Sequence, residues 1–287
     1  ELFDKETKIR QEFESHDDFL STLVSIDASF SEISDDEFNK VLNAISMERD
    51  DLPPKGYGYV HAMPCGDRSL ESIYRLEQPN RNQVCGYCEE IAQSMHVIHD
   101  HGVCCGKLTM SVIVRFNGAL KLTDLSNSVR KLESRGVAKK QRREAKYYVG
   151  SQFTSGVLPP EMIHSLDAHD SCSEVEYNKY MAYFEELRET NNAVWRKIEP
   201  QFGPESTLVV KTFLTEPYSF TRHGKQESFL AIKGNEEDLP YSPILASEAI
   251  DLWSFGCLMY ALLTGRPLFD LDRSGSFKSF ESMKELA

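Results

Sequence analysis

The chain has 287 residues, of which 40% are hydrophobic, so it is long enough to bury a large core in one or two domains. Its formal net charge of −13 lacks the basic balance that is typical of nucleic-acid-binding proteins, so we expect no nucleic acid among its partners. The longest charge-free apolar stretch, residues 252–263, is too short to span a membrane. We therefore expect a soluble globular protein with no membrane association.

The seven cysteines are odd in number and scattered along the chain, which predicts reduced thiols and a cytoplasmic (intracellular) location. Cys85 and Cys88 have the spacing of a redox pair, but they fall inside a predicted amphipathic helix, which favours buried structural thiols. Two alternatives remain open. One is redox chemistry, and the other is a zinc site made of Cys85, Cys88, His96 and His99.

Helices and strands can be predicted from the spacing of apolar and turn residues in the first half of the chain. Apolar periodicity predicts a helix over residues 1–26, and a turn at 51–58 leads into a strand at 59–63. Helices follow at 69–76 and 81–99, the second ended by Gly102. Asn117 and Gly118, between strands at 112–116 and 120–122, predict a β-hairpin.

The second half of the chain is predicted in the same way. Helical spacing recurs over residues 175–198, and short β-prone stretches lie at 208–210 and 229–232. A strongly apolar helix is expected over 247–265, beginning at Ser247 and closed by Gly265. Because the first residue is Glu1, we also expect the sequence to be a piece of a longer product.

Residues 130–146 form a basic segment within this acidic chain. It contains eight lysines and arginines against two acidic residues, Glu133 and Glu144. Three interpretations are open: a solvated loop, a docking surface for an acidic partner, or a nuclear-import or nucleic-acid patch.

Three short strings occur in the order in which protein kinases carry them in their C-terminal lobe: IHDHGV at 98–103, KLTDLS at 121–126 and DLWSFG at 251–256. The string LPPE at 158–161 stands where kinases have Ala-Pro-Glu. Over roughly residues 1–269 the chain thus resembles the protein kinase superfamily, in particular the Ser/Thr protein kinase-like domain.

This resemblance implies an α+β, protein-kinase-like fold that consists mostly of the helical C-terminal lobe. Residues 1–63 would be a remnant of the N-terminal lobe, and residues 64–287 would form the helical lobe. A long insertion, at about 165–243, would precede the Trp-bearing central helix. Because an unstructured loop of that length is rare inside a compact domain, we expect the insertion to fold.

The catalytic segment departs from the kinase pattern at the residues that carry its chemistry. Counted from His99 and Gly102, the catalytic aspartate position falls on Lys107, and the metal-binding asparagine position falls on Val112. A lysine ammonium has three donors and no acceptor, and valine offers no ligand. Asp124 keeps the position of the metal-binding aspartate, followed by Leu125 and Ser126 instead of Phe and Gly.

Further roles follow from the resemblance alone. Nucleotide would contact Met63, Pro64, Cys65, Asp67 and Ile113. Structural residues would be Glu6, His99, Glu161, Asp251 and Trp253. Glu6 would pair with a strand lysine, Glu161 with an arginine, and Asp251 would accept backbone amide hydrogen bonds.

The sequence therefore predicts a catalytically impaired kinase-like domain, a pseudokinase, that acts as a protein-binding or regulatory module. A protein partner is expected, while ATP and Mg²⁺ are the cofactors to consider, with nucleotide binding weak or absent. Two alternatives are an active Ser/Thr protein kinase that transfers the ATP γ-phosphate to protein hydroxyls and a redox helix bundle unrelated to kinases.

Overall fold

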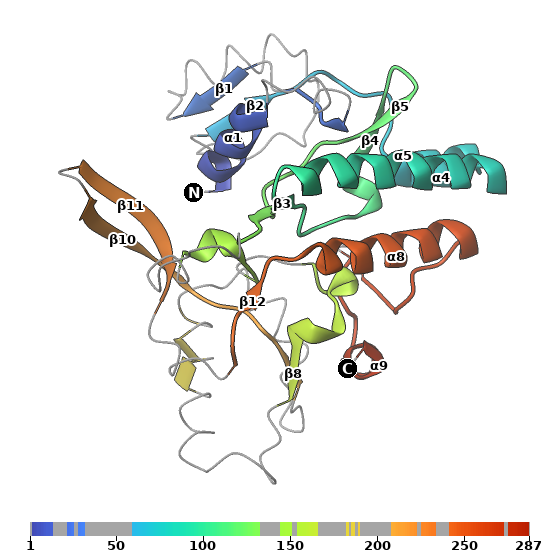
Figure 1. Cartoon of the computed structure of the whole chain (residues 1–287). Coiled ribbons are helices and arrows are strands. Elements are labelled where there is room, and N and C mark those ends of the chain that lie inside the picture. The colour runs from blue at the N-terminus through green and yellow to red at the C-terminus, as the bar shows by residue number, and fades with distance from the viewer. Residues whose placement is uncertain are drawn as a thin grey trace. The chain divides into compact units, whose positions relative to one another are not determined.

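The computed structural model describes residues 2–13, 22–25, 28–31, 59–132, 144–150, 154–165, 182–183, 185–186, 189, 208–222, 225–233, 241–272 and 275–286. The chain divides into two compact units, Glu1–Glu77 with Ser111–Ser126 and Gln78–Met110 with Asn127–Ala287. Both contain helices and short antiparallel two-stranded sheets, so the chain is a mixed α+β protein (Figure 1). This grouping by packing does not test the expected domain boundary at 63/64, which stays a prediction.

The first unit contains two helices and two antiparallel strand pairs. Its helices are α1 (Leu2–Phe13) and α4 (Leu70–Glu77). Its strands are β1 (Ala28–Ser31), paired with β2 (Tyr59–Ala62), and β4 (Ile113–Phe116), paired with β5 (Ala119–Leu122). Positive φ angles of 48° at Asn117 and 87° at Gly118 form the turn between β4 and β5, which confirms the predicted hairpin.

The predicted helix over residues 1–26 is wrong at Leu23, Val24 and Ser25, although Thr22 is helical. The helix α1 ends at Phe13, and residues 14–21 lie outside the described residues. Leu23 forms a parallel bridge with Leu122, and the Val24 amide donates to the Leu122 carbonyl at 3.1 Å. Leu23 and Val24 are both 2% exposed, so tertiary burial decides their conformation where the local apolar spacing suggested a helix.

The second unit is built on two long helices that lie side by side in Figure 1, α5 (Arg81–Asp100) and α8 (Glu248–Thr264). A capping box between Asn80 and Gln83 starts α5. The predicted glycines follow both helices in the left-handed conformation, with φ of 72° at Gly102 and 77° at Gly265. Both helix predictions are therefore confirmed to within a residue or two.

Short elements complete the second unit. They are β3 (Val103–Cys104) paired with β6 (Val129–Arg130), β7 (Tyr148–Val149) with β12 (Ile244–Leu245), β8 (Ile163–Ser165) with β9 (Leu208–Val210), β10 (Thr215–Arg222) with β11 (Lys225–Ile232), and the helix α9 (Phe280–Leu286). Single 3-10 turns lie at Met110–Val112, Ala145–Tyr147, Ser155–Val157 and Pro160–Met162.

The described part of the expected insertion is folded into the core of the second unit. Val209 and Val210 of β9 are 0% exposed and pack in the main hydrophobic cluster. The buried Tyr241 hydroxyl accepts a hydrogen bond from the Thr212 amide at 2.9 Å, which ties the two ends of β10–β11 to this core.

The predicted strand at 208–210 is confirmed, and 229–232 is the end of the longer β11. In the predicted helix at 175–198, residues 182–183, 185–186 and 189 are helical, and the others lie outside the described residues.

The cysteines behave as the sequence indicates. Those in the described part of the chain, Cys65, Cys85, Cys88, Cys104, Cys105 and Cys257, are all free thiols. Cys85 is exposed on α5 and Cys88 is buried, and burial raises the pKa of the Cys88 thiol. A raised pKa opposes the thiolate that redox chemistry requires.

Among the helices that the structure describes, none combines the length and apolarity that crossing a membrane would require.

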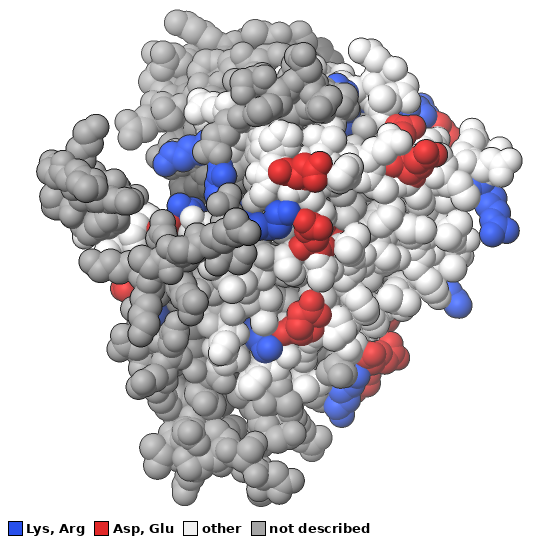
Figure 2. All heavy atoms as spheres, in the orientation of Figure 1, with Lys and Arg blue, Asp and Glu red and all other residues white. Residues whose placement is uncertain are grey.

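Charges on the described surface are interspersed. On the face in Figure 2, acidic and basic side chains lie near one another, and the surface over α8 is largely uncharged. The ends of the basic segment join ion pairs, with Lys131 bound to Glu248 and Lys146 bound to Glu144, each at 2.5 Å. Residues 133–143 of this segment lie outside the described residues, so its role stays open.

A charged clamp connects α4 to β4 in the first unit. The Arg115 guanidinium donates to both carboxylate oxygens of Glu77, at 2.9 and 2.7 Å, and also bonds Asp67. Arg68 donates to Glu77 at 2.8 Å. The hydrogen bonds from Arg115, with a smaller contribution from Arg68, hold the pKa of Glu77 at about 2 instead of 4.5.

The pH dependence of this clamp can be tested at Glu77. Because the folded-state pKa is depressed, the ion pair is complete above the ordinary pKa and is lost as the pH falls through the folded-state value. In a carboxyl-carbon NMR titration we expect a Glu77 midpoint of about 2, and Arg115→Gln should move it up toward 4.5. Arg75→Gln, which removes the same charge from α4 itself, is the matched control. Equal shifts in the two variants would mean that net charge, not the clamp, sets the midpoint.

Candidate functional site

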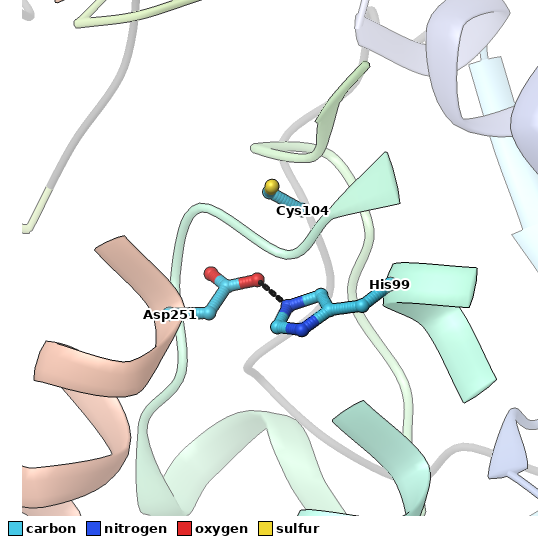
Figure 3. Close-up of side chains that lie close together, drawn as sticks. All are labelled: His99, Cys104 and Asp251. Carbon is cyan, nitrogen blue, oxygen red and sulfur yellow. Dashed lines mark hydrogen bonds and ion pairs between the residues drawn. The ribbon is translucent and has the colours of Figure 1, made fainter. Parts of the chain in front are cut away.

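The loop that follows α5 is organised by the carboxylate of Asp251, in the first turn of α8. Asp251 is 0% exposed, and its Oδ2 accepts the Cys105 amide at 2.7 Å while its Oδ1 accepts the Gly106 amide at 2.9 Å. The Nε2 of His99, at the end of α5, lies 2.8 Å from Asp251 Oδ2. Figure 3 shows His99 pointing at Asp251, with Cys104 beside them. The chain thus brings together two of the expected structural residues, His99 and Asp251.

The burial of the Asp251 carboxylate explains why it has these hydrogen-bonding partners. A buried carboxylate needs charge-assisted donors to replace water, and here two amides and an imidazole supply them. Gly106 has a φ of +69°, and a Cβ there would come within 2.4 Å of the Asn127 carbonyl oxygen. Glycine is therefore required at this position both for its backbone conformation and for the close approach of Asn127.

His99, Cys104 and Asp251 form a buried group whose ligand atoms all lie within 4.8 Å of one another, which raises the question of a metal site or a catalytic triad. Burial, together with the nearby Asp251 carboxylate, raises the pKa of Cys104 to about 12, so its thiol stays protonated at neutral pH. Both Asp251 oxygens are already engaged by donors, and all three residues are buried. The group therefore works as a hydrogen-bonding centre that shapes the loop.

The alternative zinc site of Cys85, Cys88, His96 and His99 gains no support. Within the described ranges, His99 clusters with Cys104 and Asp251, and not with the residues proposed from spacing. His96 pairs instead with Asp100 on the surface of α5, at 3.5 Å.

The two positions where kinases carry catalytic groups have no chemistry of that kind. Lys107 directly follows the Gly106 amide that Asp251 holds, and it is half-buried. The Val112 side chain is 6% exposed and belongs to the first unit, where its carbonyl accepts bonds from the Thr123 amide at 2.9 Å and the Thr123 hydroxyl at 3.0 Å. Val112 thus contributes backbone hydrogen bonding in place of a metal ligand.

Asp124 lies in the first unit, immediately after the β4–β5 hairpin. Its Oδ1 accepts two hydrogen bonds from Ser126, one from the amide at 2.9 Å and one from the hydroxyl at 2.6 Å. Ser126 is the residue that stands where the kinase pattern has glycine. The expected metal-binding oxygen is therefore engaged by a neighbouring side chain.

Glu6 was expected to pair with a strand lysine, and the structure gives it an arginine from its own helix. Arg10 donates to Glu6 Oε1 from Nε at 2.9 Å and from Nη2 at 2.7 Å, and both residues are buried. The Leu125 amide also donates to Glu6 Oε1 at 3.3 Å, and Arg10 donates to the Thr123 carbonyl at 2.6 Å. Glu6 thus contacts the segment that contains Asp124.

The residues expected to contact nucleotide are spread over the end of β2 and the start of β4. Asp67 lies beside β4 because its amide donates to the Arg115 carbonyl at 2.9 Å, and its carboxylate is bound by the Arg115 guanidinium. Met63 is half-buried, and Pro64 and Cys65 are exposed. Ile113, on β4, is 1% exposed. Both Arg115 bonds go to the Oδ2 oxygen of Asp67.

The remaining structural candidates lie in the second unit. Trp253 is partly buried and packs against the main core cluster. Its Nε1 is buried without an acceptor among the described residues. Glu161 is exposed on a 3-10 turn, and the described contacts include no arginine bound to it.

Two residues that make these contacts were missed at the level of sequence, Arg10 and Arg115, while Ser126 was noted as a departure from glycine without its bond to Asp124. Arg10 follows Glu6 by four residues, a spacing that usually indicates a surface ion pair, so its burial was not foreseeable. Arg115 bonds residues 38 and 48 positions away, which no local pattern signals.

Comparison with known proteins adds little beyond this geometry. No protein-family model matches the sequence, and no curated protein matches it at a significant level. Among solved structures, a chain of the crystal structure of the yeast RNA Pol II CTD kinase CTDK-1 complex aligns with a TM-score of 0.44 and 13% identity. The alignment covers 96% of this chain and 54% of that chain, so this chain spans about half its length. The match is a distant structural resemblance and decides nothing about activity.

The division between scaffold and chemistry can be tested by comparing two aspartates. Asp251→Ala leaves the buried Cys105 and Gly106 amides without their acceptor, so we expect a loss of about 2–4 kcal/mol in the free energy of unfolding. Asp124→Ala removes a carboxylate whose donors are half-buried, so we expect a loss of less than about 1 kcal/mol. Urea midpoints measured by circular dichroism check both values. If Asp124→Ala is the more destabilised variant, Asp251 is not the structural anchor.

Proposed function

We propose that this chain is a kinase-like domain that works by binding a protein partner and does not transfer phosphate. The observation that carries this proposal is the loop after α5. Asp251 holds its backbone through Cys105 and Gly106, while the next residue, at the catalytic position, is Lys107. The hydrogen bonds that shape the loop are present. At the position where kinases have an aspartate that accepts the proton of the substrate hydroxyl, this chain has the Lys107 ammonium.

The chemistry of phosphoryl transfer supports the same conclusion. The reaction needs a carboxylate that orients the attacking hydroxyl and metal ions held by further oxygen ligands. Lys107 offers donors only, and Val112 offers a buried apolar side chain. Of the expected catalytic groups Asp124 alone is a carboxylate, and one of its oxygens already accepts two bonds from Ser126.

A binding role is supported by the expected insertion at about 165–243, which is the part of the chain that kinases do not need for catalysis. Val209, Val210 and Tyr241, at the two ends of the segment 209–241, pack in the core of the second unit, so the exposed described residues next to them are attached to a stable scaffold. Surfaces fixed in this way are suited to recognition because little ordering entropy is lost on binding. The partner class that we propose is therefore protein, with ATP and Mg²⁺ bound weakly or not at all.

The first test measures transfer of labelled phosphate to a generic protein substrate and to the chain itself. We expect no transfer above that of Asp124→Ala, because a positioned base alone contributes about 10²–10⁴-fold and the second metal ligand is lost as well. A gain of activity in Lys107→Asp combined with Val112→Asn would identify the two missing groups. Transfer by the natural chain that disappears in Asp124→Ala would instead establish an active kinase.

The second test measures nucleotide binding by thermal melting at millimolar ATP, with and without Mg²⁺. Ligand at one hundred times its dissociation constant adds about 2.7 kcal/mol, and each kcal/mol raises the midpoint by about 2–4 °C in a chain of this size. We expect a rise of less than about 2 °C, which corresponds to ligand no more than about equal to its dissociation constant. A larger, magnesium-dependent rise that Asp124→Ala abolishes would contradict the proposal.

A further inference from the structure

In the segment Thr123 to Ser126, Thr123 and Leu125 are bonded to other parts of the first unit, and Asp124 and Ser126 are bonded to each other. The Thr123 amide and hydroxyl both donate to the Val112 carbonyl, and Arg10 donates to the Thr123 carbonyl. The Leu125 amide donates to Glu6, and Leu125 is 1% exposed. Together with the two bonds from Ser126 to Asp124, these contacts restrain every residue of the segment without a ligand.

The Arg10–Glu6 pair is strong enough to act as an anchor. Both side chains are buried, with 4% and 10% of their side-chain surface exposed, and they lie on one helix. Arg10 also donates to the Val24 carbonyl at 2.6 Å. Arg10 makes four hydrogen bonds with its five N–H donors, so a rearrangement that removes the Thr123 carbonyl would leave a buried charge with fewer partners.

Ser126 has a separate effect on the Asp124 carboxylate. A hydroxyl at 2.6 Å from Oδ1 makes a short charge-assisted hydrogen bond, and the Ser126 amide takes the second acceptor direction of the same oxygen. A divalent cation at this oxygen would have to displace the hydroxyl. Glycine, which the kinase pattern has at this position, would leave the amide bond and remove the competing one.

We propose that Ser126 is an internal competitor of metal at Asp124, and that the Arg10–Glu6 pair keeps the segment Thr123 to Ser126 in one conformation with or without nucleotide. This inference rests on the proposed function, since it explains why a chain that keeps Asp124 binds Mg²⁺ and nucleotide weakly. Ser126, Arg10 and Glu6 are positioning residues: Ser126 engages the carboxylate, while Arg10 holds the backbone before it at Thr123 and Glu6 holds the backbone after it at Leu125.

The competition is tested with Mn²⁺ as a paramagnetic probe, titrated into the whole chain and followed by electron paramagnetic resonance of free Mn²⁺. Loss of a hydrogen bond to a charged group corresponds to a change of about tenfold or more in affinity, so Ser126→Ala and Ser126→Gly should bind Mn²⁺ at least that much more tightly. Ser126→Ala combined with Asp124→Asn should lose the gain. Ser72→Ala, which removes a serine hydroxyl from α4 in the same unit, is the matched control and should bind as the natural chain does.

An unchanged Mn²⁺ affinity in both Ser126 variants would overturn the competition, as would a gain that persists without the Asp124 carboxylate. The fixed conformation is tested without any substitution, by hydrogen exchange of the Leu125 amide. We expect the same protection with and without millimolar MgATP, and a clear change on adding nucleotide would overturn it. Phosphate transfer is measured separately, so an active enzyme would disprove the proposed function while the Ser126 variants still decide the competition.

Discussion

The buried carboxylate of Asp251 is the group on which the architecture of the second unit depends. A charge that is 0% exposed is tolerated only when donors surround it, and those donors are the His99 ring and the Cys105 and Gly106 amides. They lie about 150 residues earlier in the chain, so satisfying one carboxylate fixes the loop after α5 to the start of α8. The loop is therefore shaped by backbone amides, and its shape does not depend on which side chain follows Gly106. Lys107 can therefore follow Gly106 without disturbing the bonds between Asp251 and the loop.

The first unit also contains buried charge that is compensated by hydrogen-bonding partners, here two residues of opposite charge on the helix α1. Glu6 and Arg10 neutralise each other, and their spare hydrogen-bonding capacity reaches the Leu125 amide and the Thr123 carbonyl. Pairs of this kind add little stability against an apolar alternative, but they penalise strongly any conformation that separates them. Their effect is on conformational specificity, because the backbone around Asp124 has one arrangement in which all of these hydrogen bonds are made.

Sequence patterns predicted the parts of this structure that local signals encode. Repeated apolar spacing located α5 and α8, and the Asn117-Gly118 turn located the β4–β5 hairpin. The kinase-like strings singled out His99 and Asp251 as structural residues, but not their bond to each other, which the structure adds. Prediction was poor where the conformation or the partner of a residue depends on its burial or on a residue far away in the sequence. Leu23 has the apolar character of a helix face yet forms a strand-like bridge, because its neighbour in space is Leu122. Glu6 was expected to pair with a strand lysine, and the structure shows it bonded to Arg10 of its own helix. The four-residue spacing of Glu6 and Arg10 is compatible with an ion pair but does not reveal that the pair is buried.

Binding nucleotide and transferring phosphate depend on different properties of the side chains at the positions that the kinase resemblance singles out. Transfer requires an acceptor for the hydroxyl proton, which a lysine cannot be at any pH at which it is charged. Attraction of a phosphate requires only positive charge, which Lys107 has, although the chain carries a net charge of −13 that opposes anions at long range. Metal affinity depends on a third property, the freedom of the Asp124 carboxylate, and Ser126 restricts it. Restoring the proton acceptor, the phosphate attraction or the metal affinity therefore does not restore the other two. A kinase-like chain with these substitutions would reach activity only through several simultaneous changes.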